Sequence, residues 1–381
     1  MLHVPRGSRP TQERNGRGDD RRLLEFTVFA ALPIVLTALA VYSLSFSVPV
    51  GWHRVIDFHG FWEGGRAYLR GGPLYPPIDA IKHQGQYFMY PAPMAAILAP
   101  LAFLPFAVAA TIWLLAATAS VLLAIWVLDV RDWRCFGAAF LWPSVLPAIK
   151  IGTLTPFLVL GIALLWRYRN HVWRASILTS LIIVAKLFLW PVLIWLLVTG
   201  RIRASIRAVA LMVVASLVAW LPLGIHSLVS YSHLLHKLSL AEGPHSYQPA
   251  WLGPGPASLH LVALEAASAV AAALFFWFGR RLTDARCLST AIVIALACSP
   301  IVWSHYLALL LPVVALAHKR LSPAWLAPIA LWATSQQFAD RVTWRVILVV
   351  AVAAIVWLLS REEPRRVSEH HAAGLEPPVV S

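Results

Sequence analysis

Charged residues are scarce in this sequence. Asp, Glu, Lys and Arg make up 13% of its 381 residues and 59% are hydrophobic, whereas about a quarter of a soluble domain is charged. Apolar runs recur between Leu23 and Leu359, and several approach the roughly 20 residues that a membrane-spanning helix needs. The runs are rich in Leu and Ala and lack the alternation of β-strands, so they predict helices. The composition therefore excludes a soluble domain and indicates an all-α, polytopic membrane protein.

Cysteine is nearly absent as well. The three cysteines, Cys135, Cys287 and Cys298, lie at or within apolar runs and show neither CxxC spacing nor a metal-ligand pattern. We interpret them as packing residues and expect no metal and no cofactor. A cleavable signal peptide is not expected either, because the first apolar run, Leu23 to Phe46, is too long and lacks a small-residue cleavage site. This run is expected to remain as the first span.

Negative charge is the scarcer sign, with 17 Asp and Glu against 31 Lys and Arg and a net charge of +14. In a soluble protein such an excess would indicate a nucleic-acid partner. Here the positive charge lies mostly in tails and short loops, which the positive-inside rule explains. We therefore expect membrane lipids rather than nucleic acid as partners, and both termini in the cytoplasm. The dominance of Arg over Lys, together with abundant Ala, is typical of a GC-rich bacterial genome, and the expected location is the plasma membrane of a bacterium.

The hydropathy pattern predicts one transmembrane domain at residues 23–359. Disordered cytoplasmic tails are expected on both sides of it, at residues 1–22 and 360–381. Within the domain, residues 47–105 and 224–256 are expected to form two external loops. In the first loop, the helical spacing of aromatic residues over 55–69 predicts a short helix on the membrane surface.

Two apolar stretches in the middle of the chain are interrupted. The stretch 135–166 is broken at Lys150 to Thr153, and the stretch 175–198 is broken at Lys186 and Pro191. Each half is about 18–22 Å of helix, which is shorter than a span. Basic clusters on either side favour the cytoplasm. We therefore predict two helical hairpins whose tips reach a water-filled cavity open to the outside, within a total of about twelve helices.

Three polar residues are candidates for chemistry. Asp57 lies outside the first span and could accept a proton from a sugar hydroxyl; alternatively it is a solvated acid or a helix N-cap. Lys186 lies in an apolar run and could meet a phosphate, or it reaches the interface as an ordinary snorkelling Lys. His305, at the outer junction of two spans, could contact a phosphate or an acceptor, or be a hydrogen-bonded interfacial histidine. Glu63 and Arg66 have the spacing of a weak surface ion pair.

Several segments, in this order, resemble glycosyltransferase family 87 of the GT-C class. They are Asp57-Phe58, Arg66-Ala67-Tyr68-Leu69-Arg70-Gly71-Gly72-Pro73-Leu74-Tyr75, Phe88-Met89-Tyr90-Pro91-Ala92-Pro93 with Pro100-Leu101-Ala102-Phe103-Leu104-Pro105, Pro147 with Gly152, Ala185-Lys186, and Ser299-Pro300-Ile301-Val302-Trp303-Ser304-His305-Tyr306. The resemblance implies a GT-C fold, a lipid-phosphate sugar as donor, and a catalytic Asp in the first external loop.

The expected activity is that of a membrane glycosyltransferase. It would move a sugar, mannose before arabinose, from a polyprenyl-phosphate donor to a cell-envelope glycolipid or glycan acceptor on the extracytoplasmic face. Asp57 would act as the base of a direct displacement. The other expected site residues are the donor-phosphate contacts Lys186, His305 and Arg66, and the acceptor or cavity residues His59, Glu63 and Tyr90.

Two other interpretations remain open. A transporter or lipid flippase would also have many spans and a buried Lys186, but transporters often repeat broken helices in both halves, and here they are expected in the first half only. A non-catalytic scaffold in the membrane would give Asp57 no special role.

Overall fold

The computed structural model describes residues 11–46, 55–75, 88–334 and 342–360. These residues form helices and short turns, and no strand occurs among them. The prediction of an all-α protein is therefore confirmed for this part of the chain. The expected C-terminal tail lies outside the described residues from position 361 onward, as do parts of the first external loop at 47–54 and 76–87.

Among the described residues, four helical stretches are long and apolar enough to cross a membrane: Asp19–Leu39, Phe106–Val127, Ile202–His245 and Ala257–Arg281. Several other apolar helices have only 10–17 residues. The chain is thus a helical membrane protein, but the count of about twelve spans stays a prediction. A short helix must end inside the bilayer or be sheltered there by its neighbours.

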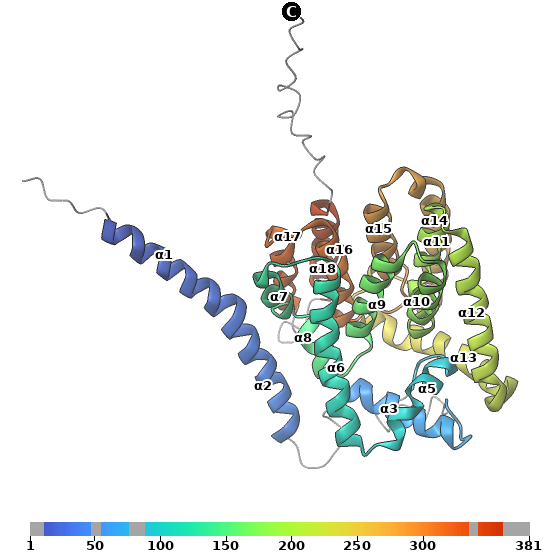
Figure 1. Ribbon diagram of the computed structural model, residues 1–381. Helices are drawn as coiled ribbons and strands as arrows, with labels where there is room; N and C mark the ends of the chain where they lie inside the picture. Colours follow the sequence, from blue (N-terminus) through green and yellow to red (C-terminus); the bar gives the residue numbers. More distant parts are fainter. Residues whose placement is uncertain (1–10, 47–54, 76–87, 335–341, 361–381) are drawn as a thin grey trace, which may run out of the picture.

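The N-terminal helix begins earlier than the sequence predicts. Helix α1 (Thr11–Phe26), a short π-helical turn (Thr27–Ala31) and α2 (Leu32–Phe46) follow one another without a break. Residues 11–22 are therefore helical, although we expected a disordered tail there. No proline lies between Thr11 and Leu32, so nothing stops the helix of the apolar run from extending backwards. In Figure 1 this helix leans away from the bundle at its N-terminal end.

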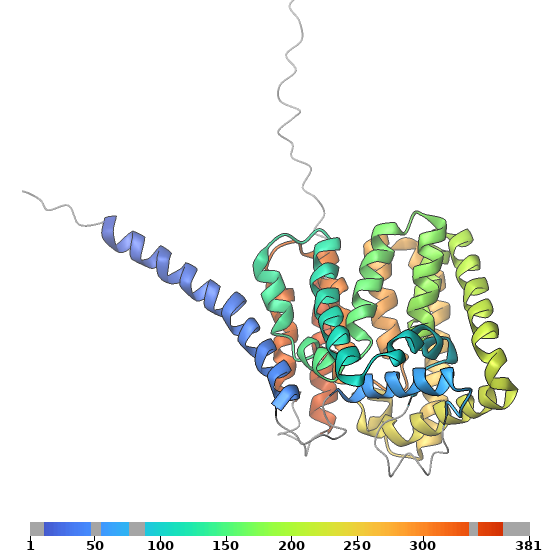
Figure 2. The same ribbon diagram turned by 60° about the horizontal axis from the view of Figure 1, so that its bottom comes forward.

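The short helix predicted in the first loop is present, and its position on the membrane surface stays a prediction. Helix α3 (Ile56–Leu69) buries Phe58 and Phe61, and it lies across one end of the long helices (Figure 2). The chain then forms α5 (Ala92–Leu98) and a 3-10 turn (Ala99–Phe103), which lead into α6 (Phe106–Val127).

The interrupted stretches in the middle of the chain are broken where the sequence predicts, and a further, unpredicted break at 141–144 divides the first of them. They form α7 (Trp133–Phe140), α8 (Val145–Lys150), α9 (Thr155–Tyr168), α10 (Val172–Ala185), a 3-10 turn (Leu187–Leu189) and α11 (Pro191–Val198). The first break turns at Gly152, whose φ of +74° suits glycine. The second break contains Lys186, whose backbone is extended, and Pro191, which starts the next helix.

The second external region differs from the expected loop. After α12 (Ile202–Trp220) and a 3-10 turn (Leu221–Leu223), residues 224–242 form a helix, α13 (Gly224–Glu242). Gly224, with φ of +75°, changes the direction of the chain before this helix. No proline interrupts residues 224–242, so the segment can remain helical despite its His and Ser residues. Short 3-10 turns (Gly243–His245 and Pro249–Leu252) then lead to α14 (Ala257–Phe278) and a further 3-10 turn (Gly279–Arg281).

The C-terminal part is less regular than uniform spans would be. It contains α15 (Asp284–Ala297), a 3-10 segment (Ser304–Leu309), α16 (Leu310–Ala317), α17 (Pro323–Leu326), a second 3-10 segment (Ala327–Thr334) and α18 (Val342–Leu359). The segment before α16 and the segment after α17 are thus 3-10 helix rather than α-helix.

One end of the bundle is strongly basic. The turns α9–α10, α11–α12 and α14–α15 meet there, and Asp284 joins them by accepting bonds from Arg169 at 2.8 Å and from Arg201 at 2.7 and 2.9 Å. We call this end the basic face. Figure 1 shows α3 and α5 at the opposite end, which we call the site face.

Candidate functional site

The break after α10 presents Lys186 toward the site face. Helix α10 has 14 residues, so Lys186 lies about 21 Å from the basic face. Its Nζ donates a hydrogen bond to the Tyr306 hydroxyl at 2.7 Å. The same ammonium lies over the rings of Tyr90 and Tyr306, at 4.6 and 4.4 Å from their centroids. Aromatic faces stabilise a cation that has lost water, so the positive charge is held in place without a direct carboxylate partner among these contacts.

Asp57 is fixed by the tip of the first hairpin. Its backbone amide donates to the Ile151 carbonyl at 2.8 Å. The next carbonyl, that of Gly152, accepts the indole N–H of Trp113 on α6, also at 2.8 Å. A Cβ at Gly152 would lie only 2.4 Å from Val55 and 2.7 Å from Phe58. The absent side chain therefore allows the start of α3, with Asp57 in its first turn, to rest against the hairpin tip.

The Asp57 carboxyl has an unusual environment. The side chain is half-buried, and this burial raises its pKa from the ordinary value to about 6, while the positive charge of Lys186 acts in the opposite direction. Desolvation thus exceeds the attraction of the cation. A carboxyl with a pKa near 6 can accept a proton at neutral pH more readily than an ordinary Asp.

Tyr90 and His305 complete the electrostatic group around Lys186. Tyr90 interacts with both Asp57 and Lys186, and buried His305 interacts with Lys186. The structure therefore brings together four residues selected from the sequence: Asp57, Tyr90, Lys186 and His305. They come from α3, the lead-in to α5, the break after α10 and the 3-10 segment before α16.

The remaining three predicted residues lie along α3 with other partners. Arg66 forms an ion pair with Glu63 at 3.5 Å, and its guanidinium lies 4.5 Å from the Trp62 ring centroid. His59 packs edge-on against Phe106, with centroids 5.3 Å apart. The structure therefore does not place these three side chains in the Lys186 group, and their roles stay predictions.

Two tyrosines near Lys186 were not selected from the sequence. Tyr306 is the hydrogen-bond acceptor of Lys186, and it directly follows His305 in a segment of the family resemblance. Tyr231, buried on α13, interacts electrostatically with Lys186 and Tyr90. Neither tyrosine side chain is charged, and both lie far from Lys186 in the sequence. Sequence spacing therefore gave no reason to select them.

An aromatic wall connects α13 to this group. The Tyr75 hydroxyl donates to the Tyr90 carbonyl at 2.9 Å. The Tyr75 ring packs against Trp220 and Tyr231, with centroid distances of 5.6 and 5.0 Å. Helix α13 thus contributes to the walls of the site, which gives the second external region a structural role.

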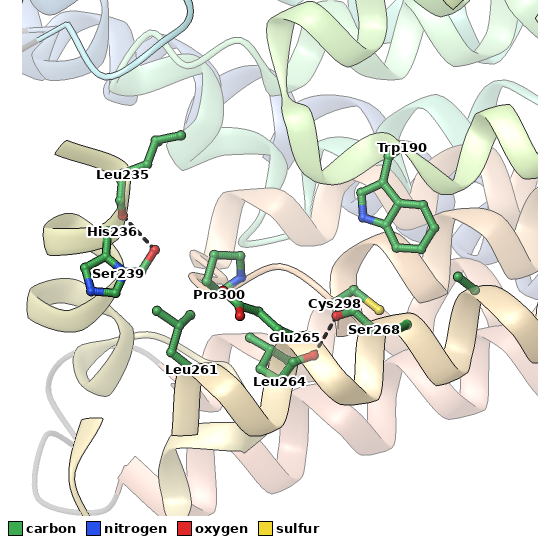
Figure 3. Close-up of a pocket in the computed structure, with 12 residues that line it drawn as sticks. Trp190, Leu235, His236, Ser239, Leu261, Leu264, Glu265, Ser268, Cys298 and Pro300 are labelled. Carbon is green, nitrogen blue, oxygen red and sulfur yellow. Dashed lines mark hydrogen bonds between the residues drawn. The ribbon is translucent and has the colours of Figure 1, made fainter. Parts of the chain in front are cut away.

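A hollow of about 490 Å³ is lined mainly by residues of α13 and α14. Figure 3 shows it between α13 and α14, with Trp190 on one side and Glu265 and Pro300 near its centre. Trp190 ends the 3-10 turn that follows Lys186. Asp57, Lys186 and His305 are not among the residues that line it. The predicted cavity that joins those three side chains is therefore not this hollow.

In the part of the chain that the structure describes, no three His, Cys, Asp or Glu side chains gather in a way that could hold a metal ion. The chemical groups of the site are thus a carboxylate, an ammonium, an imidazole and phenol hydroxyls. Such groups can transfer a proton and meet an anion.

A helical membrane protein in which a half-buried carboxylate interacts electrostatically with a half-buried cation has the features of an integral membrane enzyme. The sequence profile of glycosyltransferase family 87 matches residues 88–300, more than half of the chain, and the protein belongs to this family. The match includes Tyr90 and Lys186, while Asp57 and His305 lie outside it. The resemblance found in the sequence is confirmed, and family membership favours a glycosyltransferase over a transporter or a scaffold.

One characterised relative matches over most of its length. The chain is 24% identical over 373 residues to a polyprenol-phosphate-mannose-dependent alpha-(1-2)-phosphatidylinositol pentamannoside mannosyltransferase of Mycobacterium tuberculosis (strain CDC 1551 / Oshkosh), covering 88% of this chain and 80% of the relative. No solved structure matches the chain.

Proposed function

We propose that this protein transfers a sugar, mannose in the first instance, from a polyprenyl-phosphate donor to a glycolipid or glycan acceptor of the cell envelope. The observation that carries the proposal is the group at the site face in which Lys186, bonded to Tyr306, interacts electrostatically with half-buried Asp57. Family membership supports the reaction class. The relative's dependence on polyprenol-phosphate mannose, with a phosphatidylinositol mannoside in its name, supports the donor and a glycolipid acceptor.

Asp57 acts as the base in this proposal. The acceptor hydroxyl oxygen attacks the anomeric carbon of the donor, its proton passes to the Asp57 carboxylate, and the bond from that carbon to the phosphate oxygen breaks. The electron pair of the broken bond leaves with polyprenyl phosphate. A base whose pKa is raised to about 6 remains mostly ionised at pH 7, yet is a better proton acceptor than an ordinary Asp.

Lys186 meets the negative charge that develops on the departing phosphate. Its ammonium is already oriented by Tyr306 at 2.7 Å, so little reorganisation accompanies the reaction. An N–H of buried His305 would add a second donor beside it. Tyr90, whose ring contacts the ammonium, interacts electrostatically with both this cation and the Asp57 carboxylate.

The residues along α3 have peripheral roles in the proposal. Arg66 would reach a donor phosphate only by leaving Glu63 and the Trp62 ring, so we rank it below Lys186 and His305. His59 and Glu63 lie on the same helix as Asp57, and we assign them to the acceptor side.

The proposed orientation places the basic face in the cytoplasm and the site face outside. The arginines around Asp284 support this orientation because basic loops stay on the cytoplasmic side. Both termini would then be cytoplasmic, and about twelve helices, many of them short, would surround the site. Accessibility labelling of single cysteines placed at Lys150 and Arg280 tests the orientation, because the two positions should react from opposite sides.

The experiment for the activity uses full-length protein purified in detergent and radiolabelled polyprenyl-phosphate sugars. Mannosyl and arabinofuranosyl donors are offered separately with a glycolipid extract as acceptor. We expect transfer from the mannosyl donor. Replacement of Asp57 by Asn should reduce the rate by about 10²–10⁴-fold, the usual contribution of a general base.

The matched control is Asp129→Asn. Asp129 is an exposed acid on the loop after α6, and its φ of +62° is one that Asn also adopts, so the variant should keep its activity. Full turnover in Asp57→Asn would remove Asp57 as the base. Absence of transfer by the native protein from every lipid-phosphate sugar would refute the proposed function.

A further inference from the structure

A second hollow, of about 450 Å³, opens at the basic face. It lies between the α9–α10 and α11–α12 turns, and its lining includes Arg169, Asn170, Arg201 and Arg203. This hollow is at the opposite end of α10 from Lys186 and takes no part in the proposed reaction.

The arginines of this hollow are held in place by a shared framework. Arg201 donates to both Asp284 oxygens, at 2.9 and 2.7 Å, and to the Asn170 side-chain oxygen at 3.0 Å. Arg169 donates to Asp284 at 2.8 Å. Burial alone would raise the pKa of Asp284, but hydrogen bonds and charge from Arg201, with a bond from Arg169, lower it. The carboxylate therefore stays ionised and fixes both guanidinium groups.

The hollow nevertheless keeps an excess of positive charge. Three arginines line it, and one carboxylate, Asp284, pairs with two of them. Within the described ranges, Arg203 forms no ion pair, and its side chain is exposed. The Arg203 guanidinium is therefore available to bind a phosphate by two parallel hydrogen bonds.

Two helices also begin at this hollow. The N-caps of α10 and α12 are His171 and Arg201, and neither start has a side-chain cap. The first backbone N–H groups of a helix lack partners within it, and the helix dipole favours an anion there. Both effects add to the arginine charge.

The surroundings of the hollow are apolar. Ile202, which lines it, is 53% exposed, and nearby Trp173 and Ile206 are 61% and 62% exposed. An exposed Trp beside basic residues is typical of the membrane interface. A free phosphate would gain nothing from these side chains, whereas acyl chains would pack on them.

We propose that this hollow binds the phosphate headgroup of an anionic phospholipid of the leaflet at the basic face. The headgroup contacts Arg203 and the open side of Arg169, and its chains lie along Ile202 and Ile206. Basic pockets between helices at such a surface are known to suit anionic lipid headgroups. The bound lipid would fasten the α9–α10 and α11–α12 turns to one membrane surface.

Native mass spectrometry of the full-length protein in detergent tests the proposal. Phosphatidylglycerol and phosphatidylcholine with the same acyl chains are titrated separately. We expect one phosphatidylglycerol to bind more tightly than phosphatidylcholine, and Arg203→Gln to weaken it about fivefold, as loss of about 1 kcal/mol per basic residue implies. The control Arg280→Gln removes another exposed arginine of the same face, outside the hollow, and should change binding less than about twofold.

A third arm adds sodium phosphate in excess. Retention of the lipid under this challenge supports the headgroup assignment, whereas its displacement would show a site for free phosphate and overturn the lipid proposal. Equal affinity for the two lipids, or equal weakening by the two variants, would overturn it as well. Unfolding temperatures of both variants verify that the fold is unchanged, and Arg203→Lys should recover part of the affinity.

Discussion

Replacement of Gly152 by Ala should disable the enzyme while Asp57 remains chemically intact. A Cβ at this position would lie 2.4 Å from a Val55 methyl and 2.7 Å from the Phe58 Cβ, whereas ordinary contact begins at 3.4 Å. The start of α3 would therefore have to move by about 1 Å. Asp57 lies between the two displaced residues and moves with them. A misplacement of about 1 Å can reduce a rate by about 10²-fold.

The same substitution also has a cost in stability. Ala at a φ of +74° costs about 1 kcal/mol, and the overpacking adds about 1–3 kcal/mol. The free energy of unfolding should thus fall by about 2–4 kcal/mol. The assay is the initial rate of sugar transfer by the purified variant, measured together with its thermal unfolding at a temperature where the variant remains folded.

Gly200→Ala is the matched control. Gly200 has a similar φ of +79°, but nothing lies within 4 Å of a Cβ there. This variant should lose only the backbone contribution of about 1 kcal/mol and keep its activity. If Gly152→Ala transferred sugar at the native rate, or if both variants lost activity equally, the close approach of α3 to the hairpin tip would have no part in placing the base.

Three further predictions concern charge. The kcat/KM of transfer should rise with pH through about 6 and level off above it, because Asp57 must be ionised to accept a proton and burial raises its pKa to about 6. In Lys186→Met the midpoint of this pH–rate profile should shift to higher pH, since the cation that lowers the pKa of Asp57 is gone. A profile that does not shift would contradict the interaction of Asp57 with Lys186. Asp284→Asn should lower the unfolding free energy by about 2–4 kcal/mol, because Arg169 and Arg201 lose a partly buried partner, and an unchanged unfolding temperature would contradict this.

The sequence predicts best those features that depend on local chemistry. Helix α3 was expected at 55–69 and begins at Ile56, because the spacing of its aromatic residues defines one buried face. The breaks at Gly152 and Lys186 follow from a glycine with positive φ and from a charged residue in an apolar run. These residues act on their immediate neighbours, so their effect is visible without knowledge of the fold.

Features that depend on distant partners were not predictable in this way. Helix α13 contains His and Ser and resembles a loop, but Tyr231 joins it to Tyr75 through ring packing at 5.0 Å. Tyr306 binds Lys186 across 120 positions of sequence. For Arg66, the simpler interpretation agrees with the structure, which contains the ion pair with Glu63.

The hydrogen bond from the Asp57 amide to the Ile151 carbonyl also bears on how the protein is made. Asp57 leaves the ribosome about 94 residues before its partner, an interval of roughly 5–20 s at ordinary rates of synthesis. Before Ile151 is inserted, Phe58 can already pack on Phe106 and Trp113 of α6, but the backbone hydrogen bond of Asp57 cannot form. This restraint on the proposed base therefore forms only after a later part of the nascent chain has entered the bilayer.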